Sequence, residues 1–137
     1  MNKRYLRSIR LLAECMQQFE KLSDNFIRQF GLTHAQFDII ATLGNTSGMS
    51  CKELGEKTLI TKGTLTGVLD RLAEKKLIDR VRCTKDRRHL FIHLTPLGIQ
   101  IFENTFPQVI NMMQQRFGHA DFTELEQQLL KLKTLLK

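Results

Sequence analysis

Apolar residues recur at alternating steps of three and four through the first thirty residues. They are Ile9, Leu12, Met16, Phe19, Phe26 and Phe30, with Ser23 in the one expected apolar place that is polar. This spacing predicts a long amphipathic helix from Leu6 to Phe30. Gly31 follows the last periodic residue and indicates the helix end, because glycine adopts the left-handed conformation there without steric cost.

Further helix starts are marked by a short polar residue followed three positions later by an acid or an amide. Such a pair satisfies the free amides at a helix N-terminus reciprocally. The pairs are Thr33 with Gln36, Ser50 with Glu53, and Asp121 with Glu124. Two further starts are expected at Thr61, a candidate cap, and at Thr95-Pro96, where proline at the first helical position loses only an unpartnered donor.

Between Ile78 and Leu94 the period changes to two. Leu90, Ile92 and Leu94 alternate with polar or amphipathic neighbours, which predicts a β-hairpin whose strands are residues 78–82 and 90–94. The connecting tip, residues 84–88, is charged. Gly44–Gly48 is predicted to be a loop.

Two helices are expected after the hairpin. The first runs from Thr95 to about Arg116 and should be bent or broken near Pro107, which cannot donate a ladder hydrogen bond. The second has an apolar stripe formed by Phe122, Leu125, Leu129, Leu132 and Leu136. Together with the stripe at Ile9, Leu12 and Met16, this stripe presents more apolar surface than a lobe of about 60 residues can cover. Both stripes are therefore predicted to form a homodimer.

This order of elements predicts a fold that is mainly α with a small β-hairpin wing, an α+β architecture. Two short helices followed by a hairpin describe a winged helix-turn-helix. We expect a single domain over residues 1–137, because most domains contain about 100 to 150 residues. The lobe would span residues 33–95, and residues 1–30 and 96–137 would supply the dimerisation helices.

The helix expected from about Thr61 to Leu77 has one buried and one polar face. Its apolar stripe is Leu65, Val68, Leu69 and Leu72. The opposite face is small, polar and basic, which suits a DNA major groove because small residues allow close approach and Thr, Lys and Arg can contact base edges. The candidate DNA-binding residues of this helix are Lys62, Gly63, Thr64, Thr66, Gly67 and Arg71.

The charge distribution supports a nucleic-acid partner. The formal net charge is +7, and residues 50–95 hold 11 Lys and Arg against 6 Asp and Glu. The hairpin tip carries Lys85, Arg87 and Arg88, on a projection thin enough to enter a minor groove. Asp86 would repel phosphate there, so we expect it to brace the turn. Ser50 and Arg82 complete the predicted DNA-binding set.

Other classes of protein are disfavoured. No apolar run approaches the ~18 residues of a membrane span, so the chain is expected to be soluble and cytoplasmic, with no membrane partner. The three cysteines (Cys15, Cys51 and Cys83) are widely spaced and form no recognisable zinc motif. His89 and His93 lack further ligands at suitable spacing. We therefore expect neither a metal nor a cofactor, and no enzymatic activity, because no nucleophile is paired with a base.

Two stretches resemble the MarR family of bacterial regulators. They are the run from Thr61 to Leu72 and the pattern Asp86-x-Arg88 followed by Leu94-Thr95-x-x-Gly98, and the likeness extends over nearly the whole chain. The resemblance implies a homodimer with interleaved terminal helices, which binds a palindromic operator in double-stranded DNA. It also implies that Arg88 and Arg87 enter the minor groove.

The resemblance suggests a kind of effector, and at Gly67 this sequence departs from the family pattern. Many members respond to a small aromatic or phenolic ligand between the dimer helices and the DNA lobe, and some respond to peroxide through a cysteine. Cys15 lies too close to the second helix to align with that cysteine. Gly67 stands where many members have a larger polar residue that touches bases. A winged-helix module that binds protein without operator specificity is therefore the alternative function.

Overall fold

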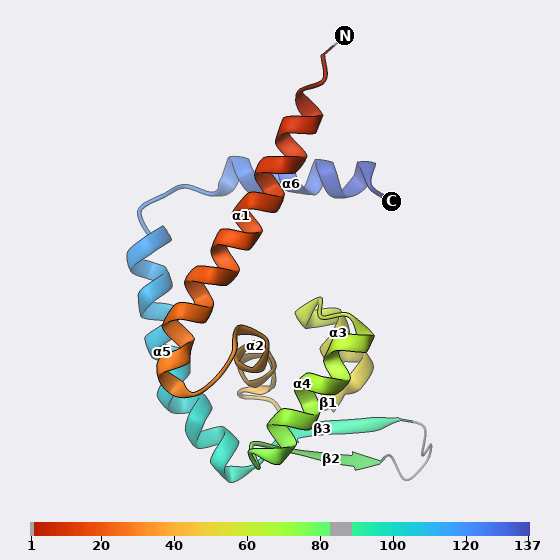
Figure 1. Cartoon of the computed structure of the whole chain (residues 1–137), viewed down its shortest axis with the longest axis vertical. Helices are drawn as coiled ribbons and strands as arrows, with labels where there is room; N and C mark the ends of the chain where they lie inside the picture. Colours follow the sequence, from red (N-terminus) through yellow and green to blue (C-terminus); the bar gives the residue numbers. More distant parts are fainter. Residues whose placement is uncertain (1, 83–88) are drawn as a thin grey trace. The chain divides into compact units, whose positions relative to one another are not determined.

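The computed structural model describes residues 2–82 and 89–137. It forms two compact units, Met1–Phe106 and Pro107–Lys137, and their boundary lies within one helix (Figure 1). The hairpin tip, with Lys85, Asp86, Arg87 and Arg88, lies outside the described residues, as does Cys83.

The first unit begins with the expected long helix. Helix α1 spans Arg4–Ile27, and its last turn tightens into the 3-10 helix η1, Arg28–Phe30. Gly31 ends this segment with a φ of 74°, as the sequence predicts. Helix α2, His34–Leu43, starts at the predicted capping box, in which the Thr33 hydroxyl accepts from the Gln36 amide and the Gln36 side chain accepts from the Thr33 amide.

Helices α3, Cys51–Thr58, and α4, Lys62–Glu74, form the helix-turn-helix pair. The Ser50 hydroxyl accepts from the Glu53 amide at 3.1 Å and caps α3. Thr61 is the residue before α4, as predicted, but its hydroxyl donates to Thr64 and caps no backbone amide. The predicted end of α4 at Leu77 is wrong. The helix ends at Glu74, and Lys76, two residues later, adopts a left-handed φ of 63° that cannot continue the helix.

The predicted hairpin forms and gains a third strand. Strand β2, Ile78–Arg82, pairs antiparallel with β3, Leu90–Leu94, so that Ile78 faces Leu94 and Arg82 faces Leu90. A two-residue strand β1, Met49–Ser50, pairs with the other edge of β3 and gives the order β1-β3-β2. The sequence analysis did not anticipate β1, because a two-residue strand has no detectable alternation.

The core of the first unit lies where the end of α1, α2, α3, α4 and the sheet meet. Its apolar residues come from each of these elements and from the segments that join them, and burying them supplies the main driving force for folding. The most completely buried include Ile27, Ile39, Ile40, Leu43, Leu54, Leu72 and Ile92.

Helix α5, Pro96–Phe117, starts at the predicted proline, and the Thr95 hydroxyl accepts from the Gly98 amide at 3.0 Å. Pro107 lies inside this helix, which continues past it, so no break occurs there. One proline removes a single ladder bond at a cost of about 3 kcal/mol, and a 22-residue helix keeps its other bonds on both sides.

The second unit contains the end of α5 and helix α6, Thr123–Leu135. The reciprocal cap predicted between Asp121 and Glu124 is wrong. The Asp121 carboxylate instead accepts from the Thr123 amide at 3.0 Å and from the Thr123 hydroxyl at 2.8 Å. The rings of Phe117 and Phe122 meet edge to face at 6.1 Å and bracket this turn.

Candidate nucleic-acid interface

Helix α4 has a sharply divided surface. Leu65, Leu69 and Leu72 are buried, whereas Val68, also expected in the apolar stripe, is half-buried. All six candidate DNA-binding residues of the helix are exposed on the other side: Lys62, Gly63, Thr64, Thr66, Gly67 and Arg71. We call this set the groove face.

The two glycines of the groove face are not required by packing. A Cβ atom built on Gly63 or Gly67 would meet no heavy atom within 4 Å. Glycine in a helix interior costs about 1 kcal/mol relative to alanine, so this pair weakens α4 without easing any contact inside the chain. The open space lies outside the helix and is available to an approaching partner.

An ion pair connects α4 to the wing strand β2. Arg80 donates from Nη1 to Oδ1 of Asp70. Arg82, the last residue of β2, is exposed next to the undescribed tip. The pair joins β2 to α4 and places a cation against the carboxylate of Asp70.

A pocket of about 500 Å³ lies between α3, α4 and the residues that open β3. It brings together two of the predicted residues, Ser50 at the start of α3 and Lys62 at the start of α4. Its other lining residues are Cys51, Lys52, Gly55, Glu56, Ile60, Leu65, His89 and Leu90. Two lysines and two helix N-termini at one pocket favour an anion over a cation.

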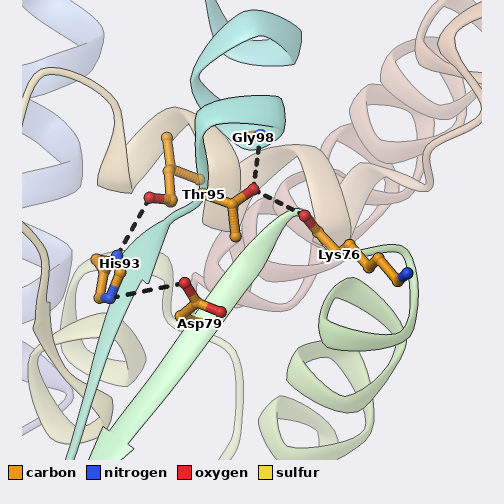
Figure 2. A network of polar contacts seen from close by, with 6 residues as sticks. Lys76, Asp79, His93, Thr95 and Gly98 are labelled. Atoms are coloured by element: carbon orange, nitrogen blue, oxygen red, sulfur yellow. Dashed lines mark hydrogen bonds and ion pairs between the residues drawn. The ribbon is translucent and has the colours of Figure 1, made fainter.

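The junction of β3 and α5 explains the Leu94-Thr95-x-x-Gly98 pattern (Figure 2). The Thr95 hydroxyl donates to the Lys76 carbonyl at 2.7 Å and accepts from Gly98. A Cβ atom on Gly98 would lie 2.1 Å from the Leu77 carbonyl oxygen. Glycine is therefore needed there, because the start of α5 packs directly on the backbone that leads into β2.

His89 and His93, before and within β3, have different surroundings. His89 precedes the strand and lines the pocket. His93 lies within the strand, with Nδ1 3.2 Å from the Leu94 carbonyl oxygen and Nε2 4.0 Å from Asp79 (Figure 2). Within residues 2–82 and 89–137, no three His, Cys, Asp or Glu side chains are grouped to hold a metal ion.

The connection between α1 and α2 contains a partly buried polar cluster. The buried Ser23 hydroxyl lies 2.7 Å from Nδ1 of His34, and the His34 amide donates to Asp24 at 2.7 Å. Burial raises the pKa of the nearby Asp38 carboxyl above its ordinary value of 3.8, and the His34 charge partly opposes this. In the second unit, the hydrogen bonds from Thr123 lower the pKa of Asp121.

The terminal helices each present apolar side chains to solvent. On α1, Ile9 and Met16 are 44% and 50% exposed, and Leu12 is half-buried. On and beside α6, Phe122, Leu125, Leu129 and Leu136 are exposed, and Leu132 is half-buried. Each helix therefore has an apolar face that is incompletely covered within a single copy of the chain.

The sequence analysis missed the side chains that hold α4 in place. Asp70 and Arg80 were not recognised as a pair, because their attraction depends on β2 lying beside α4. Lys75 was also missed. A lysine just after a helix is a general C-terminal signal, but its partners lie 44 and 39 residues away in the chain.

The helix-turn-helix, the exposed groove face and the attached hairpin together define a winged-helix DNA-binding regulator. The model of the MarR family matches residues 32–90, which contain α2, the helix-turn-helix and strand β2. Over these residues the chain is similar to the MarR family of transcription regulators.

Curated relatives agree with this assignment. The HTH-type transcriptional regulator MhqR of Bacillus subtilis (strain 168) is 27% identical over 104 residues, which are 74% of this chain and 72% of MhqR. The HTH-type transcriptional regulator SarZ of Staphylococcus aureus (strain USA300) is 34% identical over 74 residues. That match covers 54% of this chain and half the length of SarZ.

Solved structures share the fold over nearly the full chain. AbsC, a MarR family regulator from Streptomyces coelicolor, superposes with a TM-score of 0.85 at 23% identity, over 99% of this chain and 96% of AbsC. Reduced AbfR bound to DNA gives 0.80 at 27% identity, over the whole of both chains. Bordetella bronchiseptica BpsR, whose DNA binding is regulated by 6-hydroxynicotinic acid, gives 0.77 at 26% identity, over 96% of this chain and 99% of BpsR.

No helix in the described part of the chain is both long and apolar enough to span a lipid bilayer.

Proposed function

We propose that this regulator binds a palindromic operator as a homodimer and represses transcription by occluding a promoter. The observation that carries the proposal is the exposed groove face of α4, whose two glycines leave open space outside the helix. The likeness to DNA-bound AbfR over the whole chain supports DNA as the partner. A cytoplasmic location follows from a role on genomic DNA.

Each DNA-binding residue receives a specific role in this proposal. Lys62, Thr64, Thr66 and Arg71 contact base edges in the major groove, while Gly63 and Gly67 allow the helix backbone to approach. Ser50 and Arg82 contact the phosphate backbone. At the wing tip, Lys85, Arg87 and Arg88 reach the minor groove, braced by Asp86.

The homodimer rests on the uncovered apolar faces of α1 and α6. Exposed leucine and phenylalanine in such number are unfavourable in water, and burying them releases about 25 cal/mol per Å². In a symmetric dimer, a second copy of the chain covers these faces with the same apolar faces of its own α1 and α6. Two lobes then meet half-sites about one helical turn apart, which is why the operator should be a palindrome.

A small aromatic or phenolic acid is the proposed effector that releases DNA. BpsR is regulated by 6-hydroxynicotinic acid, and NadR has been crystallised with 4-hydroxyphenylacetate, at 25% identity and a TM-score of 0.63 to this chain. An acid that binds more tightly when the two α4 helices are spaced differently from their DNA-bound spacing would weaken DNA binding. The size of the effect is set by the difference in its affinity for the two spacings.

A salt titration of DNA binding tests the proposal. Fragments selected by the protein from genomic DNA are labelled, and their affinity is measured between about 50 and 200 mM salt. The logarithm of affinity should fall steeply with the logarithm of salt, with a slope near −0.9 per phosphate neutralised. A palindrome shared by the selected fragments would support the dimer.

The alternative, a winged-helix module that binds protein, predicts the opposite result. DNA would then be bound weakly or without sequence preference, and competition with unrelated DNA would remove it. Gly67 is the reason for this alternative, because glycine has no side chain that could contact a base. An affinity that is independent of salt and sequence would favour this alternative.

A further inference from the structure

The end of α4 is a compact turn built by backbone hydrogen bonds. The Leu77 amide donates to the Leu72 carbonyl at 3.0 Å and the Lys76 amide to the Ala73 carbonyl at 2.9 Å. Lys76 adopts a left-handed φ of 63°. These are the bonds of a Schellman cap, which place Lys75 at the C-cap, directly after the last helical residue Glu74, and set where its side chain leaves α4.

The Lys75 ammonium joins α4 to two elements from the start of the chain. Its Nζ donates to the Gly31 carbonyl at 2.7 Å and to Oε1 of Gln36 at 3.1 Å. Gly31 ends the α1 segment, and the buried Gln36 belongs to the capping box of α2. One cation therefore contacts the end of α1, the start of α2 and the end of α4. We call this contact the Lys75 clasp.

The opposite side of the same turn is held by Thr95, which precedes α5. The Thr95 hydroxyl donates to the Lys76 carbonyl (Figure 2). The Thr95 amide donates to the Leu77 carbonyl at 3.1 Å. These bonds fix the exit of the chain into β2. The Lys75 clasp differs in its partners, because it joins α4 to the α1–α2 connection rather than to the start of α5.

The clasp lies at the end of α4 farthest from the start of the groove face. Lys62 is 13 residues before Lys75, which corresponds to about 20 Å along the helix. A rotation of about 3° about the clasp would move Lys62 by about 1 Å, more than the ~0.5 Å tolerance of a well-placed binding site. A contact at Lys75 can therefore control where the groove-face side chains meet DNA.

We propose that Lys75 is a positioning residue for DNA recognition: its ammonium, bonded to Gly31 and Gln36, fixes the orientation of α4 against the α1–α2 connection. The inference rests on the proposed DNA binding by the groove face. It assigns Lys75 no contact with DNA. A change in the α1–α2 connection would reach α4 through this clasp.

Lys75→Met tests the clasp, because methionine keeps an unbranched side chain and removes the ammonium. Lys76→Met is the matched control. It removes the same charge from the next residue, whose side chain is not part of the clasp. Lys75→Arg is the rescue variant, because a guanidinium can donate to the same two oxygens. Each variant is first checked for folding by thermal unfolding, and Lys75→Gln replaces Lys75→Met if the latter does not fold.

The affinities are measured on a fragment selected by the wild-type protein. Lys75→Met should bind this fragment about fivefold to hundredfold more weakly, the cost of one misplaced base contact, with an unchanged salt slope. Lys76→Met should stay close to wild type, and Lys75→Arg should recover most of the affinity. Hydrogen exchange should rise at residues 31–36 in Lys75→Met and stay unchanged in Lys76→Met.

Two results would overturn the inference while the proposed function stands. One is equal affinity for Lys75→Met and Lys76→Met on a fragment that the wild type binds. The other is a salt slope lowered by about 0.9 in Lys75→Met alone, which would place Lys75 on a phosphate. Failure of the wild type to bind any selected fragment would instead overturn the proposed function.

Discussion

Arg80 of β2 donates to the carboxylate of Asp70 on α4, so the wing strand and the groove-face helix are joined by an ion pair. The pair is partly exposed, with 34% of the Arg80 side chain and 50% of the Asp70 side chain accessible. Solvent and salt therefore screen it, and its effect on the free energy of unfolding should be small.

We predict that Asp70→Asn and Arg80→Gln each destabilise the fold by less than about 1 kcal/mol in urea unfolding. The double-mutant cycle should yield a coupling of about 0.2–1 kcal/mol, the range for exposed pairs. The coupling should shrink at 1 M salt. A coupling that is independent of salt would contradict this account of the pair.

Gly67→Ala should separate stability from DNA binding. The added Cβ meets nothing within 4 Å, and alanine is the better helix former, so the free energy of unfolding should rise by up to about 1 kcal/mol. If α4 approaches DNA at this glycine, affinity for the selected fragment should fall at the same time. Urea unfolding and DNA titration measure the two effects.

Gly55→Ala is the control for that experiment. Gly55 lies on α3, where a Cβ would meet Leu65 at an ordinary 3.7 Å. This variant should gain helix stability in urea unfolding, and it controls for the stability change alone, because Gly55 lines the pocket that contains Ser50 and Lys62. Unchanged DNA affinity in Gly67→Ala would place this part of α4 away from the groove.

Leu129→Asp should dissociate the proposed dimer, because it places a charge on the exposed apolar face of α6. Sedimentation should show a monomer, and affinity for the palindromic fragment should collapse, since one lobe alone contacts half of the site. Gln127→Asp adds the same charge at an exposed polar position and should remain dimeric. A monomeric Leu129→Asp that still bound the palindrome tightly would refute the symmetric arrangement.

Asp38→Asn should stabilise the protein at neutral pH. Burial raises the pKa of this carboxyl in the folded state, so the fold favours the protonated form. The free energy of unfolding of the wild type therefore falls as pH rises from below the ordinary pKa of 3.8 through the folded pKa. Asparagine does not titrate, so the variant lacks this loss. The difference in melting temperature should be largest at neutral pH and should vanish in acid. A constant difference across this range would contradict the assigned cause.

Local chemistry made much of the fold predictable. The capping box at Thr33, the cap at Ser50 and the glycine end at Gly31 each depend on residues within a few positions, so the sequence alone locates those helix ends. The period-two pattern at Leu90, Ile92 and Leu94 likewise located the hairpin. The reciprocal cap at Asp121 is wrong because the Asp121 carboxylate accepts hydrogen bonds from Thr123 instead. The helix is not broken at Pro107, because it extends well beyond the proline on both sides.

The sequence by itself determined which face of α4 is polar, because helical periodicity assigns Leu65, Leu69 and Leu72 to the inside whatever lies around them. Only the tertiary structure decided how that face is held. Gly31 and Lys75 are 44 residues apart in the sequence, and helical periodicity relates only residues within one helix. Their contact exists because burial of the apolar stripes brings the ends of α1 and α4 together, and a hydrogen bond forms only between groups already within reach.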